Sequence, residues 1–298
     1  MTMPTAVGID VGGTKAAAVR VDADATIQAH ALVDTPATDV PALLDAMRRA
    51  VNEVLDPSTT AIGIAAAGLV ERGTGEMRFA PNIAWRDVDL GAEVAGFGLP
   101  SVVDNDCTMA ASGELLAGAG RGVADFVYVG MGTGIGGGLV VDGAVRHGAH
   151  GFAGEIGHII VEPGGITCGC GNEGCLETVA SGQAITRLGH ERLGVDGYGV
   201  VAAAKAGDET ARAILDEVGR RLGQGIGGLV NVFDPSLVIV GGGPPASAGD
   251  LLLGPARRAS HETIMAATSR PEVPIVPAAL GADAAAVGAA LSALEEAS

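Results

Sequence analysis

One imidazole and three thiols stand close together in the sequence, in a glycine-rich stretch that covers residues 151–177. His158 is followed by Cys168, Cys170 and Cys175. Three thiolates and one imidazole are the ligands that a closed tetrahedral zinc site requires. Several glycines free the backbone to wrap a metal ion. The spacing therefore predicts a structural zinc site, and the second ring nitrogen of His158 remains available for another partner.

The four cysteines could instead form two disulfides. The opening residues, MTMPTAVGID, lack the basic and apolar regions of a secretory signal, and no uncharged run reaches membrane-spanning length. We therefore expect a cytoplasmic protein with reduced thiols, and Cys107 as a small buried residue.

Glycine turns follow three of the expected strands. Strands over residues 6–10 and 16–21 enclose Asp10 and the turn Gly12-Gly13-Thr14-Lys15, and a third strand is expected over 27–33. A strand over 126–130 leads into a second turn, and a strand over 237–240 leads into a third; these turns comprise Gly132, Thr133 and Gly134, and Gly241, Gly242 and Gly243. The first turn is neither a Walker loop nor a dinucleotide fingerprint. Alone it could be a simple hairpin turn, but the second glycine and threonine turn repeats it, which indicates backbone N–H groups and hydroxyls that hold a polyphosphate.

Three polar residues, Asp104, Asn105 and Asp106, end a short strand over 101–105 and open a helix. Helix capping explains one such residue, since Asn and Asp are favoured there. Ligands bind beyond the carboxyl ends of strands in open α/β sheets. We therefore interpret this cluster as functional rather than as a cap alone.

The composition limits the partners of this chain. It has 298 residues, 48% of them hydrophobic but only 3% aromatic, and a formal net charge of −17. This charge disfavours nucleic acid and anionic membranes as partners. It does not exclude a phosphorylated ligand, which backbone N–H groups and a cation can hold.

Helical periodicity is expected over 39–55, 181–193, 208–233 and 281–296. The third of these contains five glycines between Gly219 and Gly228, which suggests that another element packs closely against its backbone. A βββαβ pattern precedes residue 107 and a second one follows it, interrupted by the cysteine-rich loop. The economical interpretation is two related α/β halves that face each other across a cleft.

With these motifs in place, the chain resembles the sugar kinases of the ROK (repressor, open reading frame, kinase) family, in the actin-like ATPase superfamily. The resemblance covers nearly the whole chain and is most specific at GEIGH and CGCGNEGCLE. It implies two ribonuclease-H-like α/β domains: residues 1–107 with 281–298, and residues 108–280, which carry the zinc loop and the dimer surface. A homodimer or a dimer of dimers is expected.

The resemblance also implies roles for individual residues. Asp106 is expected to be the catalytic base. The expected sugar ligands are Asn82, Asn105, Asp106, Glu155, His158 and Glu177. The expected ATP and magnesium site comprises Asp10, which acts through water, with Gly12, Gly13, Thr14, Lys15, Gly132, Thr133, Gly134, Gly241, Gly242 and Gly243. The expected zinc ligands are His158, Cys168, Cys170 and Cys175.

The expected activity is an ATP-dependent hexose kinase of glycolysis, with glucose as the favoured substrate. The alternatives are kinases of N-acetylmannosamine, N-acetylglucosamine, fructose or allose, polyphosphate as the donor, and a non-catalytic sugar-responsive regulator. Repressors of this kind carry a winged helix–turn–helix ahead of the first phosphate motif. Only nine residues precede Asp10 here, so we expect no such domain.

Overall fold

The computed structural model describes residues 3–36, 38–80 and 86–297. Contacts between residues group the chain into two compact units. The first comprises Met1–Ala124, Gly138–Gly154 and Ala279–Ser298, and the second comprises Asp125–Gly137 and Glu155–Ala278. The domain ranges expected from the sequence, 1–107 with 281–298 and 108–280, stay a prediction.

The first sheet has the strand order β3-β2-β1-β4-β8. β1 pairs antiparallel with β2 and parallel with β4, which in turn runs parallel to β8. The three parallel strands therefore bring their carboxyl ends, and the polar residues there, to one edge of the sheet. The strands are β1 (Thr5–Val11), β2 (Lys15–Asp22), β3 (Ile27–Asp34), β4 (Thr59–Ala66) and β8 (Ser101–Asn105).

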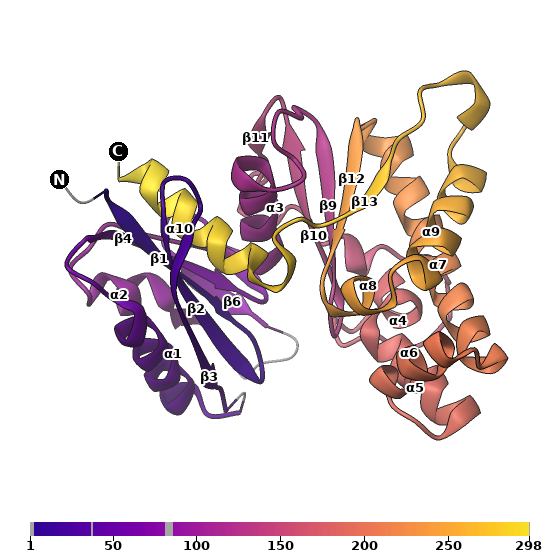
Figure 1. Cartoon of the computed structure of the whole chain (residues 1–298), viewed down its shortest axis with the longest axis horizontal. Helices are drawn as coiled ribbons and strands as arrows, with labels where there is room; N and C mark the ends of the chain where they lie inside the picture. Colours follow the sequence, from indigo (N-terminus) through magenta and orange to yellow (C-terminus); the bar gives the residue numbers. More distant parts are fainter. Residues whose placement is uncertain (1–2, 37, 81–85, 298) are drawn as a thin grey trace. The chain divides into compact units, whose positions relative to one another are not determined.

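Helices cover both faces of this sheet (Figure 1). Helix α1 (Val40–Val54) begins at Asp39, whose side chain accepts a hydrogen bond from the Ala42 N–H. It packs with Val7 and Ile9 on one face, whereas α10 (Ala284–Glu296) packs with Ala6 and its neighbours on the other. This alternation along β1 is the period of two that a buried strand requires.

Helix α10 approaches the sheet so closely that glycine is required at the contact. A Cβ on Gly8 would lie 1.8 Å from the Ala286 carbonyl oxygen, and one on Gly63 would lie 2.0 Å from that of Ala289. A Cβ on Gly288 would likewise lie 1.8 Å from the carbonyl oxygen of Met109 in α3 (Asp106–Ala117). The glycine- and alanine-rich composition thus fills this part of the core with backbone instead of bulky side chains.

A three-stranded sheet completes the first unit among the described residues. Its order is β5-β6-β7, and all its pairings are antiparallel. The elements of this layer are β5 (Leu69–Glu71), β6 (Glu76–Phe79), β7 (Val88–Asp89) and α2 (Leu90–Ala95).

The second large sheet repeats the topology of the first. Its order is β11-β10-β9-β12-β13, with β9 parallel to β12 and β12 parallel to β13. Taken in chain order, its strands occupy the same sequence of places as those of the first sheet, which confirms the predicted pair of related α/β patterns. The strands are β9 (Phe126–Met131), β10 (Ile135–Val141), β11 (Ala144–Val145), β12 (Leu237–Gly241) and β13 (Ile275–Pro277).

The helices of the second unit include several that the sequence patterns did not predict. Helix α9 contains Pro255, a residue that usually ends a helix, and α6 consists largely of Gly, Ala and Val and has little amphipathic periodicity. The helical segments are η1 (Ile156–His158), α4 (Leu176–Ala180), α5 (Gly182–Leu193), α6 (Gly197–Ala206), α7 (Glu209–Phe233), α8 (Gly243–Ala248), α9 (Asp250–Thr263) and η2 (Ala267–Ser269), and η3 (Gly281–Asp283) precedes α10 in the first unit.

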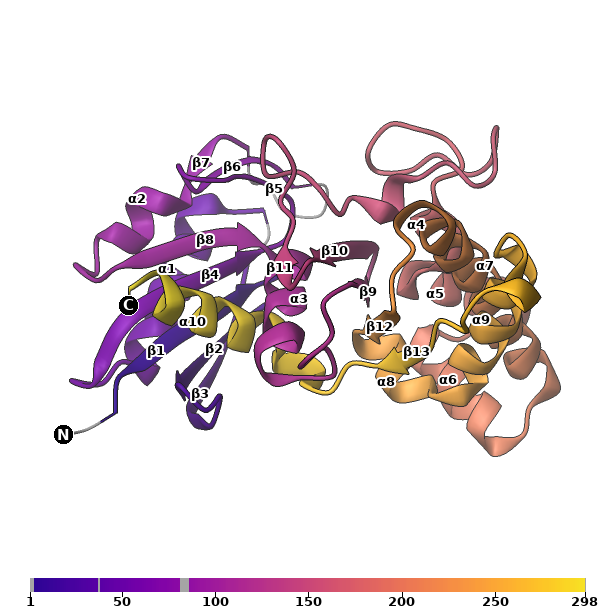
Figure 2. The ribbon, with the colours of Figure 1, turned by 90° about the horizontal axis from the view of Figure 1, so that it is seen from above.

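The expected close neighbour of the α7 glycines is α9, and Figure 2 shows the two helices side by side. A Cβ on Gly219 would lie 2.4 Å from the Leu252 carbonyl oxygen, and one on Gly223 would lie 2.1 Å from that of Ala256. A Cβ on Gly228 would meet nothing within 4 Å.

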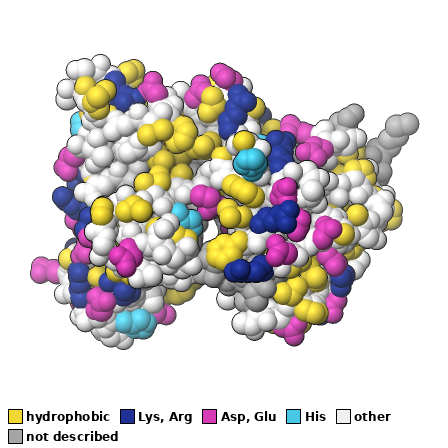
Figure 3. Space-filling view, turned by 180° about the vertical axis from the view of Figure 1, so that it is seen from behind, with side chains coloured by type: hydrophobic (Ala, Val, Ile, Leu, Met, Phe, Trp, Pro, Cys, Tyr) yellow, Lys and Arg dark blue, Asp and Glu magenta, His cyan; other side chains and the backbone are white. Residues whose placement is uncertain are grey.

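The surface drawn in Figure 3 carries Lys and Arg side chains interspersed with Asp and Glu, without a continuous basic area. Within the described parts of the chain, no helix has the length and apolar character needed to cross a bilayer.

Two glycines of α7 should respond to alanine in opposite directions. We expect Gly228→Ala to raise the free energy of unfolding by up to about 1 kcal/mol, because alanine favours a helix interior over glycine. We expect Gly223→Ala to lower it by roughly 1–3 kcal/mol, because the methyl group must displace the α9 backbone. Urea unfolding of the two variants measures both changes, and a stabilised Gly223→Ala would contradict this packing.

Candidate functional site

Two carboxylates of the first unit lie at the carboxyl ends of parallel strands. Asp10 is near the end of β1, and Asp106 directly follows β8. Burial, together with the negative charges of Asp106 and Asp283, raises the pKa of Asp10 from its ordinary 3.8 to about 7. Three carboxylates close enough to repel one another favour the binding of a cation, which would relieve that repulsion.

Asp106 is held at the first position of α3. Its Oδ1 accepts a hydrogen bond from the Cys107 N–H at 2.8 Å. Burial raises the pKa of Asp106, although this hydrogen bond opposes the shift. The side chain is therefore a stronger base than an exposed aspartate, and its carboxylate has a fixed direction.

Asn105 caps α3, so the capping interpretation holds for this residue. Its Oδ1 accepts from the N–H groups of Cys107 at 2.9 Å and Thr108 at 3.1 Å. Its Nδ2 donates to the carbonyl oxygen of Gly68 at 3.0 Å. These bonds occupy both lone pairs of the amide oxygen and one N–H. A side-chain hydrogen bond from Asn105 also lowers the pKa of Asp106, against the effect of burial.

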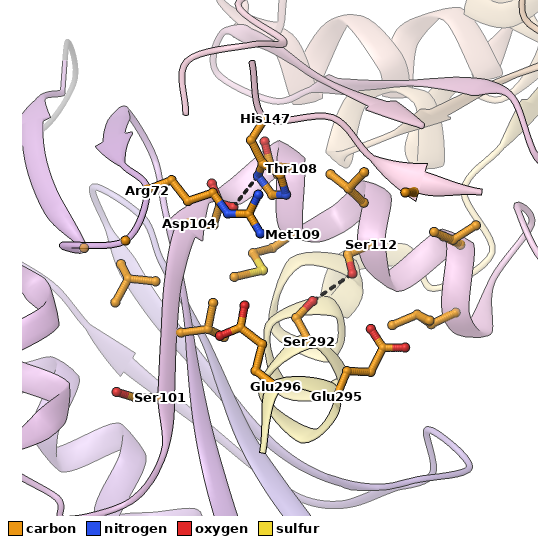
Figure 4. Close-up of a pocket in the computed structure, with 18 of the residues that line it drawn as sticks. Arg72, Ser101, Asp104, Thr108, Met109, Ser112, His147, Ser292, Glu295 and Glu296 are labelled. Carbon is orange, nitrogen blue, oxygen red and sulfur yellow. Dashed lines mark hydrogen bonds and ion pairs between the residues drawn. The ribbon is translucent and has the colours of Figure 1, made fainter. Parts of the chain in front are cut away.

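The side chain of Asp104 contacts the backbone of its neighbour Asn105 and one residue outside the expected cluster. Its Oδ1 accepts a hydrogen bond from the Asn105 N–H at 2.7 Å. Asp104 is buried, and its Oδ2 lies 2.8 Å from the Nδ1 of His147. Both residues line a pocket of about 670 Å³ in the first unit, together with Arg72 and the end of α10. Figure 4 shows Arg72 reaching toward this pair, apart from the Ser112–Ser292 hydrogen bond.

The first glycine turn joins β1 to β2. The Gly12 N–H donates to the Lys15 carbonyl at 3.0 Å, and the Thr35 hydroxyl donates to the Gly12 carbonyl at 2.8 Å. Thr14 and Lys15 are exposed, whereas Gly12 and Gly13 are half-buried. The turn is thus closed from within, and its tip is open to a ligand.

The second and third glycine turns lie at neighbouring parallel strands, β9 and β12. The Gly132 N–H donates to the Gly134 carbonyl at 3.0 Å, and Thr133 is exposed between them. In the third turn, Gly242 has φ of 103°, and a Cβ there would lie 2.0 Å from the Met131 carbonyl oxygen. Gly241 ends β12 and Gly243 begins α8, so the three turn residues connect the strand directly to a helix N-terminus.

The predicted zinc ligands converge. One ligand atom from each of His158, Cys168, Cys170 and Cys175 lies within 4.8 Å of all the others. The Sγ atoms of Cys170 and Cys175 are 3.7 Å apart. Two thiolates on one tetrahedral zinc, each about 2.3 Å from the metal, stand about 3.8 Å apart, so this spacing fits zinc and is too long for a disulfide. All four cysteines of the chain are free of disulfides.

The three thiols differ in acidity. Burial raises the pKa of Cys168, and burial together with hydrogen bonds to Cys170 and Cys168 raises the pKa of Cys175 to about 12, whereas burial at Cys170 is outweighed by hydrogen bonds, which lower its pKa. A bound cation would be needed to keep the sulfurs of Cys168 and Cys175 ionised at neutral pH, so binding would release protons.

His158 faces in two directions, as the sequence predicted. Its Nδ1 lies 3.6 Å from the Cys168 Sγ, and its Nε2 lies 3.7 Å from a carboxylate oxygen of Glu155. Nδ1 is therefore the candidate metal ligand. A metal on Nδ1 would fix the ring plane and direct Nε2 toward the space beside Glu155.

Glu177 lies in the first turn of α4 and approaches the second glycine turn. Its Oε2 accepts from the Ile135 N–H at 2.9 Å, and its Oε1 lies 3.6 Å from the Cys168 Sγ. The three predicted sugar ligands of the second unit, Glu155, His158 and Glu177, are thus grouped around the cysteine cluster.

One predicted sugar ligand is not described by the structure, and one acidic residue near Asp10 was not predicted. Asn82 lies outside the described residues. Asp283, which sequence patterns did not single out, contributes to the field at Asp10, and its Oδ1 lies 3.3 Å from the His30 Nε2. An acidic residue two positions after Gly281, at the start of the last helix, was the available signal.

Comparisons with known proteins agree with this arrangement. The sequence profile of the ROK family matches residues 6–296. A glucokinase of Streptomyces coelicolor is 38% identical in an alignment of 309 positions that covers 97% of each chain. An N-acetylmannosamine kinase of Citrobacter koseri is 35% identical in an alignment of 257 positions that covers 82% of this chain and 84% of that protein.

A solved structure is also similar over almost the whole chain. It is a ROK family glucokinase from Streptomyces griseus in complex with glucose and AMPPNP. It is 38% identical, has a TM-score of 0.92, and the match covers 98% of this chain and 99% of that chain.

The buried carboxyl group of Asp10 should make ligand-free stability depend on pH. The folded state retains this proton up to about pH 7, whereas the unfolded chain loses it near 3.8, so stability falls as pH rises between these values. We expect Asp10→Asn to be more stable than the wild type at pH 8, by roughly 1–4 kcal/mol, with little difference at pH 4. Urea unfolding in EDTA at both pH values measures this, and equal differences at the two pH values would contradict it.

The cysteine cluster should bind one zinc ion per chain. We expect Cys170→Ser to lose that metal, because a hydroxyl is a poor substitute for a thiolate ligand. Cys107→Ser, which lies outside the cluster, is the matched control and should retain zinc. Elemental analysis of freshly purified protein measures both, and a wild-type chain without zinc would contradict the metal assignment.

Proposed function

We propose that this chain, which belongs to the ROK family, is an ATP-dependent hexose kinase with glucose as its favoured acceptor. The observation that carries this proposal is the near-full-length similarity to a glucokinase solved with glucose and AMPPNP, combined with the grouping of Glu155, His158 and Glu177 on the cysteine cluster. The reaction transfers the γ-phosphoryl group of ATP to a sugar hydroxyl.

Asp106 is the proposed catalytic base. Phosphoryl transfer depends mainly on positioning and on neutralising negative charge, so the base has to hold and accept one proton. The raised pKa of Asp106 increases its affinity for the proton of the attacking hydroxyl. The bond from the Cys107 N–H keeps the carboxylate oriented as that proton moves.

The sugar is recognised by directed polar groups. Glu155 and Glu177 can each accept from two hydroxyls, which suits vicinal diols. His158 Nε2 and the amide of Asn105 supply further partners, and Asn82 is proposed from the resemblance alone. Zinc, held by His158 and the three cysteines, is proposed to be structural, because four protein ligands leave no open position.

The nucleotide is held largely by backbone. Gly12, Gly13, Thr14 and Lys15 form the first proposed phosphate contact, and Gly132, Thr133 and Gly134 form the second. Gly241, Gly242 and Gly243 lie beside the adenosine. Bound magnesium would neutralise phosphate charge, and Asp10 would hold it through water, consistent with the repulsion that raises the pKa of Asp10.

The arrangement of the whole molecule is proposed on the family resemblance. We propose two domains with an active-site cleft between them, a homodimer or dimer of dimers, and a cytoplasmic enzyme of glycolysis. The second candidate substrate is N-acetylmannosamine, because an N-acetylmannosamine kinase is 35% identical to this chain.

A coupled ADP-release assay over hexoses and N-acetylhexosamines, with ATP or polyphosphate as donor, tests the activity and its base. We expect the highest kcat/KM with glucose and ATP. We expect Asp106→Asn to lower kcat by roughly 10²–10⁴ while sugar affinity is retained, because the amide cannot accept the proton.

Asp142→Asn, an exposed carboxylate outside the proposed site, is the control and should keep full turnover. A wild-type chain that phosphorylates no monosaccharide would overturn the proposed function. Near-normal turnover of Asp106→Asn would overturn only the role of that residue.

A further inference from the structure

The backbone of Ile135 contacts two segments that carry proposed sugar ligands: the start of α4 with Glu177, and residues 155–158. Its N–H donates to the Oε2 of Glu177 at 2.9 Å. On the other side, a Cβ on Gly157 would lie 2.1 Å from the Ile135 carbonyl oxygen. Gly157 directly precedes His158, so the helical turn that carries Glu155 and His158 packs against this peptide unit. Ile135 directly follows the second glycine turn, the proposed contact for phosphate, and begins β10.

The residues after Glu177 hold the rest of that turn. The Gly182 N–H donates to the Gly132 carbonyl at 2.9 Å, and the Gln183 N–H donates to the Thr133 carbonyl at 3.2 Å. Both donors lie at the start of α5, shortly after α4. The segment from Glu177 to Gln183 therefore contacts the turn at three points, and only one of them, the Glu177 bond, uses a side chain.

Gly134 is explained by this side chain. Its φ lies outside the left-handed region, so its backbone conformation alone does not require glycine. A Cβ at this position would lie 1.8 Å from the Glu177 Oε2 and 2.8 Å from its carboxyl carbon. The absence of a side chain at residue 134 is thus the condition that lets the carboxylate reach Ile135.

The Glu177 carboxylate can accept hydrogen bonds from the Ile135 N–H and from a sugar hydroxyl at the same time. An ionised carboxylate has about four lone-pair positions, and the bond to Ile135 uses one of them. A sugar hydroxyl that donates to the Glu177 carboxylate would bind best when that carboxylate already has a fixed position. A phosphate that orders the second glycine turn would also order Ile135, and the bond from Ile135 would then hold the carboxylate in place.

We propose that Glu177 is a positioning residue that couples the proposed sugar site to the phosphate-binding turn, through its bond to Ile135 and the space left by Gly134. This inference rests on the proposed function. Whichever of the two ligands binds first, sugar or nucleotide, orders both Glu177 and the turn. The second ligand then loses less free energy to that ordering, so the coupling is positive and reciprocal. We expect an ATP analogue to tighten glucose binding by roughly tenfold, within the usual range of such effects.

Titration calorimetry of glucose, with and without AMPPNP and magnesium, tests the coupling. Gly134→Ala should weaken glucose binding in the absence of nucleotide by about tenfold and reduce the coupling factor toward one, because its methyl group displaces the carboxylate. Gly228→Ala, which lies in α7 outside the proposed site, is the control, and its Cβ would meet nothing within 4 Å. Its glucose affinity without nucleotide should stay within about twofold of the wild type.

Substitutions of Glu177 give an independent test should Gly134→Ala fail to fold. Glu177→Ala removes the acceptor for Ile135 and should abolish the coupling. Glu177→Gln keeps an amide oxygen that can accept that N–H, so it should retain part of the coupling even where glucose affinity falls. A residue that served only as a sugar ligand would lower affinity in both variants and leave the coupling factor unchanged.

The outcomes separate the two proposals. If the wild type binds and phosphorylates glucose but AMPPNP leaves glucose affinity unchanged, the coupling is overturned and the kinase stands. The same conclusion follows if Gly134→Ala, with its zinc intact, matches the wild type in affinity and coupling. If the wild type phosphorylates another hexose, that sugar replaces glucose in the titrations. If it binds no sugar, both proposals fail.

Discussion

The packing of this molecule depends on close contacts between backbones. These contacts occur at glycines, where a side chain larger than a hydrogen atom would not fit. The last helix lies on the first sheet at Gly8 and Gly63, and α7 lies on α9 at Gly219 and Gly223. With 3% aromatic residues, the chain has few bulky side chains to fill a core. Dense packing of small residues replaces them, and it makes the positions of the elements sensitive to single added methyl groups.

The same constraint extends from the core to the site. Gly157 and Gly134 let two segments contact the Ile135 peptide unit, so the cysteine cluster and the second glycine turn form a single local structure in the second unit. The first unit instead carries buried carboxylates at the ends of its strands, and their negative charges repel one another. The second unit thus carries a candidate metal cluster, and the first carries an aspartate whose pKa is raised by burial and by neighbouring carboxylates.

Much of this could be predicted from the sequence, because the informative signals are local. Asp39 and Ser181 cap the helices that they were expected to begin, and buried strands end at the expected turns. The cysteine spacing was sufficient to predict the metal cluster. Helix α9 was missed because Pro255 lies inside it. The bond between Ile135 and Glu177 joins residues 42 positions apart, and the partner of Asp104 is His147, so tertiary packing alone determines both.

The position of α10 affects how the first unit can fold during synthesis. One face of its sheet, which includes Ala6 of β1 and Ala61 of β4, is covered by residues 286–293. The ribosome makes these residues after the entire second unit. Domains generally fold as they emerge, yet this one has to wait with an apolar surface exposed. Nascent chains of this protein should therefore depend on chaperones for longer than the early place of β1 in the chain would suggest.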